Sequence, residues 1–578
     1  MKQKKRFLLI VTLLIFCAAL TAVASNFKGE KSYDYIDLMK IAKTEGYVRV
    51  IVHMDVQRIH ELTAESNRYK TGYGDIVYIS EASAADEKLK RAISHTADQV
   101  LHELKGKTYE INHIFSTIPY LGLNLSPEAL MVMKNLPQVL TIREDRPHPL
   151  PETWKENGND SIAKPQLVDS TKLVGADKAW SMGYTGDGWY VAILDSGIRR
   201  THEFFTGKNI VEQCYSLLKD CPNGQNSMSG TGAAAHIMSG EYHGTHVSGI
   251  AAGNNKNNMY GVAKDADIIM VQVFSYIAAW NDIGSYDSDQ IKGLEYLYQK
   301  RNQYKIAAVN MSLGGYEYTG PCDSIYGAEK AAIDNLKAVR IPTVIASGNA
   351  AACGAIDAPA CISSAVAVSG TDKSDNHWFW ASWHQTMVDL MAPGAGIVSA
   401  KTNSNTHYGS ASGTSMSTPH VTGAYAILRQ FDPNLSFANA LKVFKDEGKK
   451  ITSLCQATPQ TPRIDVGAAI QSLMSLAPPL NFAGEQEINR SLLQTEYLNL
   501  LTWDSNPQNA QNNQNIVKYR IYTVDNSNNL TFLAEVDADT FEYRHRMVTK
   551  DTEYKYGVKS INDKGEDSTP AYTTVETL

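Results

Sequence analysis

The chain has 578 residues and a formal net charge of −7, with 61 acidic and 54 basic side chains. A chain of this length is expected to form about three or four domains. The mild negative charge provides no basic footprint, so nucleic acid is not expected as a partner. Beyond the N-terminal leader, no apolar stretch is long enough to cross a bilayer, and no membrane span is expected.

Residues 1–24 are predicted to be a signal peptide. A basic start precedes an apolar centre, and Ala22-Val-Ala24 forms a cleavage site ahead of Ser25. A membrane anchor is the rival interpretation, which the flanking residues disfavour. A lipoprotein signal ending at Cys17 is disfavoured by the bulky Phe16. We therefore expect a secreted, extracellular protein.

Residues 45–145 are predicted to form a small α+β unit. Residues 48–54 alternate as a strand, and residues 84–104 carry apolar side chains at helical spacing. Residues 111–125 return to strand, and Pro127 opens a short helix before a last strand at 139–142. The expected order is therefore strand, helix, strand, helix, strand.

A polar segment follows at residues 146–164. Pro147, Pro149 and Pro151 precede a run of polar residues, a composition typical of a linker. We expect the chain to be processed in this region.

Residues 165–475 are predicted to be an α/β domain with a parallel sheet covered on both faces by helices. The run Val191–Leu194 is continuously apolar, as in a strand buried on both faces. Asp195 ends this strand, and Ser196-Gly197 break it. The carboxylate is thus expected at the carboxyl edge of the sheet, where α/β folds place their ligands.

Two helices are predicted to begin at chemically active side chains. His243 precedes a run of small residues typical of a tightly packed helix. Ser415 begins a second helix that continues to Leu428. A helix N-terminus offers unpaired N–H groups and a partial positive charge, which suit an oxyanion. Pro419 lacks an N–H, so the Ser415 carbonyl is expected to lose its usual partner within the helix.

Two further segments follow predicted strands. Ser347-Gly348-Asn349 comes after an apolar run, and by itself it indicates a turn. Ser312-Leu313-Gly314 precedes Gly315, and glycines there would permit close approach of another backbone.

Six of the seven cysteines lie beyond the predicted signal peptide. An even number in an exported chain favours disulfides, for which 15 pairings are possible. Cys214 with Cys221 is the expected local pair, and the cysteines show no metal-ligand spacing with histidines.

Residues 480–578 differ in character from the rest. Trp503 and alternating segments such as 517–522 and 554–558 predict short strands of an all-β sandwich. The hydroxyl of Tyr554 is expected to make a corner hydrogen bond to the backbone.

The three phrases around Asp195, His243 and Ser415 come in the order acid, base, nucleophile, which is the subtilisin order. On these phrases the chain resembles the subtilisin-like serine protease family. The resemblance implies that Asp195 orients His243, that His243 is the general base, and that Ser415 is the nucleophile. For His246, the resemblance implies a structural hydrogen bond and no catalytic role.

The same resemblance assigns the remaining site residues. It makes Asn349 an oxyanion donor and Ser312, Leu313 and Gly314 a substrate-binding segment. Asp357 would line the pocket for the residue before the scissile bond; an acidic loop residue facing water is the alternative. Protein or peptide substrates are implied, and no cofactor is required for the chemistry.

The resemblance extends to three structural expectations. Residues 45–145 would be an inhibitory propeptide, the alternative being an unrelated binding module. Residues 480–578 are similar to fibronectin type III domains, and this domain is expected to bind a surface or a substrate. A structural calcium site would use Asn255, but the family's carboxylate ligand falls near Phe204, where the chain has no Asp and only Glu203 is adjacent.

Two functions from different classes are consistent with this organisation. One is a self-processing secreted serine endopeptidase, and the other is an adhesion protein built on an inactive subtilisin-like scaffold. The presence of Asp195, His243, Ser415 and Asn349 together favours the enzyme.

Overall fold

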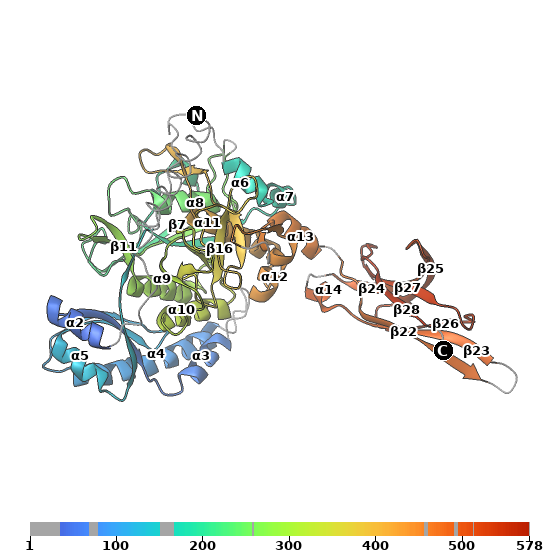
Figure 1. The fold of residues 1–578 in the computed structure, drawn as a ribbon, viewed down its shortest axis with the longest axis horizontal. Helices are drawn as coiled ribbons and strands as arrows, with labels where there is room; N and C mark the ends of the chain where they lie inside the picture. Colours follow the sequence, from blue (N-terminus) through green and yellow to red (C-terminus); the bar gives the residue numbers. More distant parts are fainter. Residues whose placement is uncertain are drawn as a thin grey trace, which may run out of the picture. The chain divides into compact units, whose positions relative to one another are not determined.

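The structure is a computed structural model that describes residues 35–68, 79–150, 167–256, 259–455, 460–474, 476–490, 495–511 and 514–576. The predicted signal peptide and most of the predicted linker lie outside these residues. The chain divides into two compact units, Met1–Ala468 and Ala469–Leu578 (Figure 1).

The N-terminal region of the first unit is an antiparallel sheet packed against helices. Its strands are in the order β2-β3-β1-β4, and the apolar faces of sheet and helices enclose one core. The strands are β1 (Val48–Met54), β2 (Tyr109–Ile114), β3 (Tyr120–Leu125) and β4 (Val139–Glu144). The helices are α2 (Tyr35–Glu45), α3 (Ile59–Arg68), α4 (Ile79–Glu103) and α5 (Pro127–Lys134).

The prediction of a single strand over residues 111–125 is wrong, because this stretch contains two strands, β2 and β3. The turn between them carries Phe115 and Ile118, both buried in the same core cluster as side chains of the large parallel sheet. Burial of this turn against the following domain, rather than local propensity, therefore sets the break. The structure also has a second helix, α3, between β1 and α4, and a helix α2 before β1; the predicted helices α4 and α5 and strands β1 and β4 are present.

The rest of the first unit, from Leu167 on, is the region predicted to be catalytic, and we call it the catalytic part. It contains a ten-stranded sheet in the order β20-β21-β17-β16-β14-β12-β6-β9-β7-β8. The strands from β21 to β7 pair in parallel, and only the two edge strands β20 and β8 are antiparallel. The strands are β6 (Tyr190–Asp195), β7 (Ile210–Tyr215), β8 (Ser227–Ser229), β9 (Asp267–Gln272), β12 (Ile306–Met311), β14 (Thr343–Ala346), β16 (Val366–Thr371), β17 (Leu390–Pro393), β20 (Lys449–Ile451) and β21 (Thr461–Arg463). The predicted α/β parallel sheet is confirmed.

Helices cover this sheet in two packed pairs. Helices α8 and α11 contact each other and β6, whereas α9 and α10 contact each other, with α9 also against β6 and α10 against β14 (Figure 1). The helices are α6 (Leu167–Leu173), α7 (Ala176–Ser181), η3 (Glu203–Phe205), α8 (His243–Ala252), α9 (Asp287–Lys300), α10 (Gly327–Ala338), α11 (Thr414–Phe431), α12 (Phe437–Glu447) and α13 (Val466–Met474). Both helices predicted to begin near His243 and Ser415 are confirmed.

Three small sheets border the large one. One of them, β10-β11-β5, includes Pro147–Pro149, which was expected to be linker. The strands are β5 (Pro147–Pro149), β10 (Ser275–Ile277), β11 (Asp282–Tyr286), β13 (Gly315–Tyr318), β15 (Ile356–Ala358), β18 (Ile397–Ala400) and β19 (Tyr408–Ala411). The segment just after the N-terminal sheet is therefore held as a strand against the catalytic part.

Three disulfides cross-link the catalytic part. The expected local bond Cys214–Cys221 is present. The other two bonds are Cys322–Cys361 and Cys353–Cys455, which close loops of 39 and 102 residues. Both hold segments next to Asp357, because Cys353 and Cys361 flank it in the sequence.

The second unit contains two antiparallel sheets, β22-β23-β26 and β25-β24-β27-β28. Its elements are β22 (Leu480–Arg490), β23 (Thr495–Asp504), α14 (Pro507–Gln511), β24 (Ile516–Val524), β25 (Leu530–Asp537), β26 (Glu542–Arg546), β27 (Tyr554–Asn562) and β28 (Ala571–Val575). Trp503 lies in its core, and the Thr549 N–H donates to the Tyr554 hydroxyl at 3.0 Å, as expected for that tyrosine.

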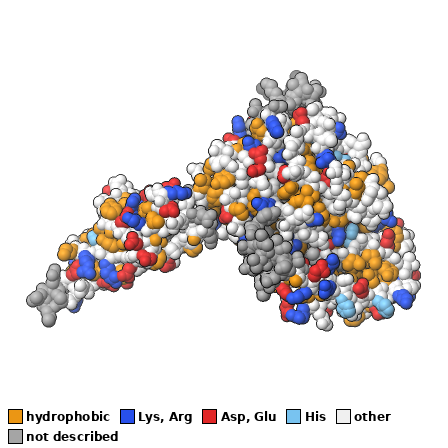
Figure 2. Space-filling model, turned by 180° about the vertical axis from the view of Figure 1, so that it is seen from behind, with side chains coloured by type: hydrophobic (Ala, Val, Ile, Leu, Met, Phe, Trp, Pro, Cys, Tyr) orange, Lys and Arg blue, Asp and Glu red, His pale blue; other side chains and the backbone are white. Residues whose placement is uncertain are grey.

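Surface chemistry is mixed. Figure 2 shows acidic and basic side chains interspersed on the face it presents. Among the described residues, no helix combines the length and the apolar character that a bilayer crossing requires.

Candidate active site

The acid and the base predicted from the sequence are hydrogen-bonded to each other. Asp195 lies at the carboxyl end of β6 and His243 in the first turn of α8, and both are buried. His243 Nδ1 lies 2.8 Å from Asp195 Oδ1, which also accepts the Ser196 N–H at 2.7 Å. Burial by itself would lower the pKa of His243, but the Asp195 charge and hydrogen bond raise it overall.

Ser415 lies in the first turn of α11, where the missing N–H of Pro419 was expected to orphan its carbonyl. The Ser312 hydroxyl donates to that carbonyl at 2.8 Å, so the orphaned group has a partner from the segment that follows β12. The Ser415 hydroxyl in turn donates to the Ser312 carbonyl at 3.3 Å. The break in the helix is thus used to connect Ser415 to the segment predicted to bind substrate.

The structure does not join Ser415 to His243 by a hydrogen bond. His243 Nε2 is buried and has no hydrogen-bond partner among the described residues, while α8 and α11 pack against each other. Such contacts are often long without substrate and tighten only when it binds.

Asn349 follows β14 and lies against the start of α11. Its amide oxygen accepts the Thr414 N–H at 2.9 Å and the Thr414 hydroxyl at 3.0 Å. A Cβ atom added to Gly413 would lie 3.1 Å from Asn349 Nδ2. The Thr414 contacts therefore orient the amide so that its nitrogen lies beside the segment leading into Ser415.

Asp357 lies between the oxyanion segment and the predicted substrate-binding segment. A Cβ at Gly348 would be 2.5 Å from Asp357 Oδ2, and one at Gly314 would be 3.3 Å from Asp357 Cβ. Burial, with a further contribution from Glu317, raises the pKa of Asp357 to about 7. The side chain, which is partly exposed, therefore lies beside two glycines of the site.

Glu241 is a buried neighbour of the base that sequence reasoning missed. Its carboxylate accepts the His243 N–H at 2.5 Å and the Ser196 hydroxyl at 2.6 Å, and it pairs with His236. Burial opposes its ionisation, but these partners, led by His236, lower the pKa of Glu241 to about 2. It therefore stays charged and holds the first turn of α8 against the end of β6.

His246 has the structural role expected for it. Its Nε2 lies 3.1 Å from the Gly409 carbonyl, and the side chain is buried. Burial lowers the pKa of His246 to about 3, so the ring stays neutral.

The calcium ligands implied by the resemblance fit poorly. Asn255 Oδ1 already accepts the Met259 N–H at 3.2 Å, and Phe204 packs against Gly253 at the start of the loop. Glu203 accepts a hydrogen bond from Tyr408 at 2.9 Å. Among the described residues, no group of three or more His, Cys, Asp or Glu side chains could hold a metal.

Excess EDTA should therefore leave the melting temperature unchanged. Calcium prefers several oxygen ligands including carboxylates, and the described loop offers an amide oxygen that is already engaged. Thermal unfolding with EDTA, compared with an equal concentration of magnesium-saturated EDTA, checks this. A drop in Tm that added calcium reverses would restore the calcium prediction.

Comparison with known proteins places this geometry in a family. A model of the subtilase family matches residues 186–448. The chain is 33% identical to subtilisin DY of Bacillus licheniformis over 268 aligned residues. The alignment covers 46% of this chain and 85% of that protein. The chain belongs to the subtilase family. Among its subtilase relatives, extracellular serine proteinase of Thermus sp. (strain Rt41A) is 32% identical, over 54% of this chain and 67% of that protein. Alkaline protease of Alkalihalobacillus alcalophilus is 29% identical, over 64% of this chain and 84% of that protein.

As a subtilase, the protein is a subtilisin-like serine endopeptidase that acts on protein substrates. Catalysis in this family needs no cofactor. The catalytic-type residues of this subtilase lie within the matched range, whereas the N-terminal sheet and the second unit lie outside it.

Proposed function

We propose that the protein is a secreted serine endopeptidase that processes itself from a zymogen, with Asp195, His243 and Ser415 as its triad. The observation that carries the proposal is the 2.8 Å hydrogen bond between His243 and Asp195, with Ser415 in the first turn of α11, the helix that packs against α8. Nε2 of His243, which is buried and has no hydrogen-bond partner in the described part of the chain, is the atom required to take a proton from a nucleophile.

In the proposed reaction, the Ser415 hydroxyl attacks the carbonyl carbon of a peptide bond while His243 Nε2 takes its proton. Asp195 holds the ring so that Nδ1 carries a proton and Nε2 does not, and it stabilises the imidazolium that forms. The developing oxyanion lies against the N-terminus of α11 and the Asn349 amide. His243 then protonates the leaving amine, and water releases the acyl group through the same steps in reverse.

Labelling by a fluorophosphonate probe tests this function. The probe phosphonylates only an activated serine, and we expect peptide mapping to locate the adduct at Ser415. Failure to label active, folded protein would overturn the assignment of the nucleophile.

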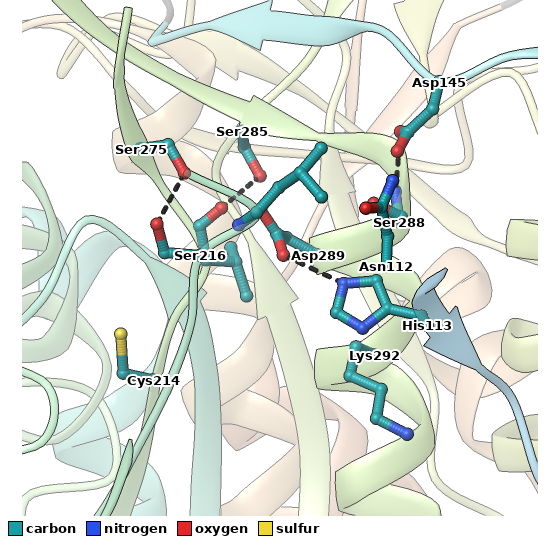
Figure 3. A network of polar contacts seen from close by, with 12 residues as sticks. Asn112, His113, Asp145, Cys214, Ser216, Ser275, Ser285, Ser288, Asp289 and Lys292 are labelled. Atoms are coloured by element: carbon teal, nitrogen blue, oxygen red, sulfur yellow. Dashed lines mark hydrogen bonds and ion pairs between the residues drawn. The ribbon is translucent and has the colours of Figure 1, made fainter. Parts of the chain in front are cut away.

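We further propose that residues 45–145 form an inhibitory propeptide. The carboxylate of Glu295 in α9 accepts the N–H groups of Ser116 and Thr117 at 2.5 and 2.8 Å. Figure 3 shows two more contacts with the start of α9: His113 toward Asp289, at 3.3 Å, and Asp145 toward Ser288, whose N–H it accepts at 3.0 Å. These buried and partly buried polar contacts, together with β5 pairing along β11, support an N-terminal region that covers the catalytic part.

Ser415→Ala should accumulate as a longer species after export. If the enzyme cuts its own chain between residues 145 and 170, removal of the nucleophile leaves the N-terminal region covalently attached. Mass spectrometry of wild type and variant from a protease-deficient host measures this. Maturation of the variant at the wild-type rate would show that another protease makes the cut.

Three finer assignments belong to the same proposal. The substrate backbone would bind to Ser312, Leu313 and Gly314, because two hydrogen bonds join Ser312 to Ser415. In each of them the hydroxyl of one serine donates to the carbonyl of the other. Asp357 would line the pocket for the residue before the scissile bond. The second unit would be a fibronectin type III-like domain that binds a surface or a substrate, supported by its sheets of three and four antiparallel strands.

A further inference from the structure

The strand β5 inserts His148 into the catalytic part of the chain. Pro147–Pro149 pair antiparallel with β11, with His148 opposite Ser285. On the other side of β5, a Cβ at Gly315 would lie 3.3 Å from the Pro149 ring and 3.5 Å from His148 Nδ1. The segment therefore lies extended between β11 and the start of β13, directly after the predicted substrate-binding segment.

His148 is held there by an acidic and two aromatic side chains, which we call the His148 subsite: Asp287, Tyr316 and Tyr326. The imidazole is 1% exposed, and its Nε2 lies 2.6 Å from Asp287 Oδ1. Its ring packs edge-on against Tyr316 at 5.2 Å and lies 6.0 Å from the Tyr326 ring. A buried carboxylate beside aromatic rings is a combination that binds cations.

A second cation reaches the same carboxylate. Arg143 of β4 pairs with Asp287 Oδ2 at 2.5 Å and with Glu329 Oε1 at 2.8 Å, and its guanidinium lies 4.7 Å from the centre of the Tyr326 ring. The Glu329 side chain is 1% exposed, and its Oε2 has no hydrogen-bond partner among the described residues. The two carboxylates therefore offer one hydrogen-bond acceptor, Glu329 Oε2, that neither Arg143 nor His148 uses.

The two cations come from the N-terminal side of the chain, and the two carboxylates belong to the catalytic part. Arg143 precedes the predicted processing region and His148 lies near its start, so a cut after residue 148 separates both cations from Asp287 and Glu329. Departure of the N-terminal region would leave two buried carboxylates without their cations, which is unfavourable unless another cation replaces them.

We propose that the His148 subsite, together with Glu329, selects a cationic side chain, arginine above all, from extended peptide substrates at the position that His148 occupies. The inference rests on the proposed proteolytic function. Arginine is favoured because its fork reaches Asp287 and Glu329 at once, as that of Arg143 does, whereas histidine pairs with Asp287 alone.

Peptides copied from residues 145–150, which leave out Arg143, test the proposal. Active protein, purified after expression of the full chain, is assayed for casein hydrolysis at about pH 8, and each peptide is measured as a competitive inhibitor. With arginine in place of His148, the inhibition constant should be no higher than that of the native peptide. Citrulline, which has the shape of arginine without its charge, should raise it about tenfold, and glutamate about 100-fold, the range expected for a lost charged hydrogen bond. Equal constants for arginine, citrulline and glutamate would overturn the inference.

Variants of the enzyme locate the effect. Asp287→Asn should reduce the preference for arginine over citrulline to below about threefold. Glu329→Gln should weaken inhibition by the arginine peptide and leave the native histidine peptide unchanged, because only a guanidinium contacts Glu329. Asp282→Asn removes the same charge from an exposed position of β11 and should change neither.

The outcomes separate the two proposals. Casein hydrolysis without any preference at this position would overturn the subsite and leave the proteolytic function standing. Absence of both hydrolysis and fluorophosphonate labelling would overturn the function and the subsite with it. If Asp287→Asn does not fold, Glu329→Gln and the peptide series still decide, since an unchanged arginine preference in Glu329→Gln would refute the role of Glu329.

Discussion

Replacing Ser415 by alanine should lower kcat about 10⁶-fold, the loss seen when the nucleophile is removed from subtilisin, a relative of this protein. The Ser415 hydroxyl oxygen forms the acyl-enzyme bond. In the described site, no other serine in the first turn of α11 is hydrogen-bonded to Ser312. The residual rate would come from the oxyanion donors and from substrate binding. Initial rates on a chromogenic peptide measure the loss.

Ser410→Ala is the matched control for this experiment. It removes the same hydroxyl from β19, five residues before the nucleophile, and should retain wild-type kcat and labelling. Both variants should share the wild-type melting temperature within a few degrees. Full activity in Ser415→Ala, with Tm unchanged, would show that the nucleophile lies elsewhere.

Asp195→Asn should lower kcat by about 10⁴-fold, as the corresponding change does in serine proteases with this triad. An asparagine amide can donate to His243 Nδ1, which would place the ring proton on Nε2, the atom required to act as base. The variant also loses the charge that stabilises the imidazolium. Single-turnover kinetics on the same peptide separate this loss from any change in substrate binding.

The pH dependence of kcat/KM should also change in Asp195→Asn, in a direction that the pKa of His243 determines. The base works in its neutral form, and the Asp195 charge raises the pKa of His243 above its ordinary value of 6.5. Wild-type kcat/KM should therefore fall as the pH drops through a value above 6.5. Without the carboxylate, burial lowers the pKa of His243, so the acid limb of Asp195→Asn should move to lower pH. A limb that does not move would mean that another group controls it.

Most of the candidate site can be predicted from the sequence because its residues occupy the ends of regular elements. An apolar run stops at Asp195, a run of small residues begins at His243, and Ser415 begins a predicted helix that contains Pro419. These are local signals, since burial on both faces of a strand or tight helix packing requires particular side chains over a few consecutive positions. The parallel sheet and both helices follow from them.

Tertiary structure decided which polar groups meet. Ser312 supplies the partner that Pro419 removes from the Ser415 carbonyl, over a separation of 103 residues. Glu241 carries no sequence signal, because nothing local distinguishes a carboxylate that will be buried beside a histidine from one that will face water. The pairing of two disulfides could not be predicted from the sequence either, since closing a long loop depends on which distant segments the fold brings together.

The N-terminal region shows the same division between local and distant information. Alternation and helical spacing predict its strands and helices, yet the break between β2 and β3 comes from the burial of Phe115 and Ile118 against another part of the chain. Pro147–Pro149 have the composition of a linker, and only pairing with β11 makes them a strand. The sequence by itself determines the elements and the residue types available for catalysis. The tertiary structure decides the partners of buried charges such as Asp287, because the free energy of burying a charge depends on groups that lie more than 100 residues away.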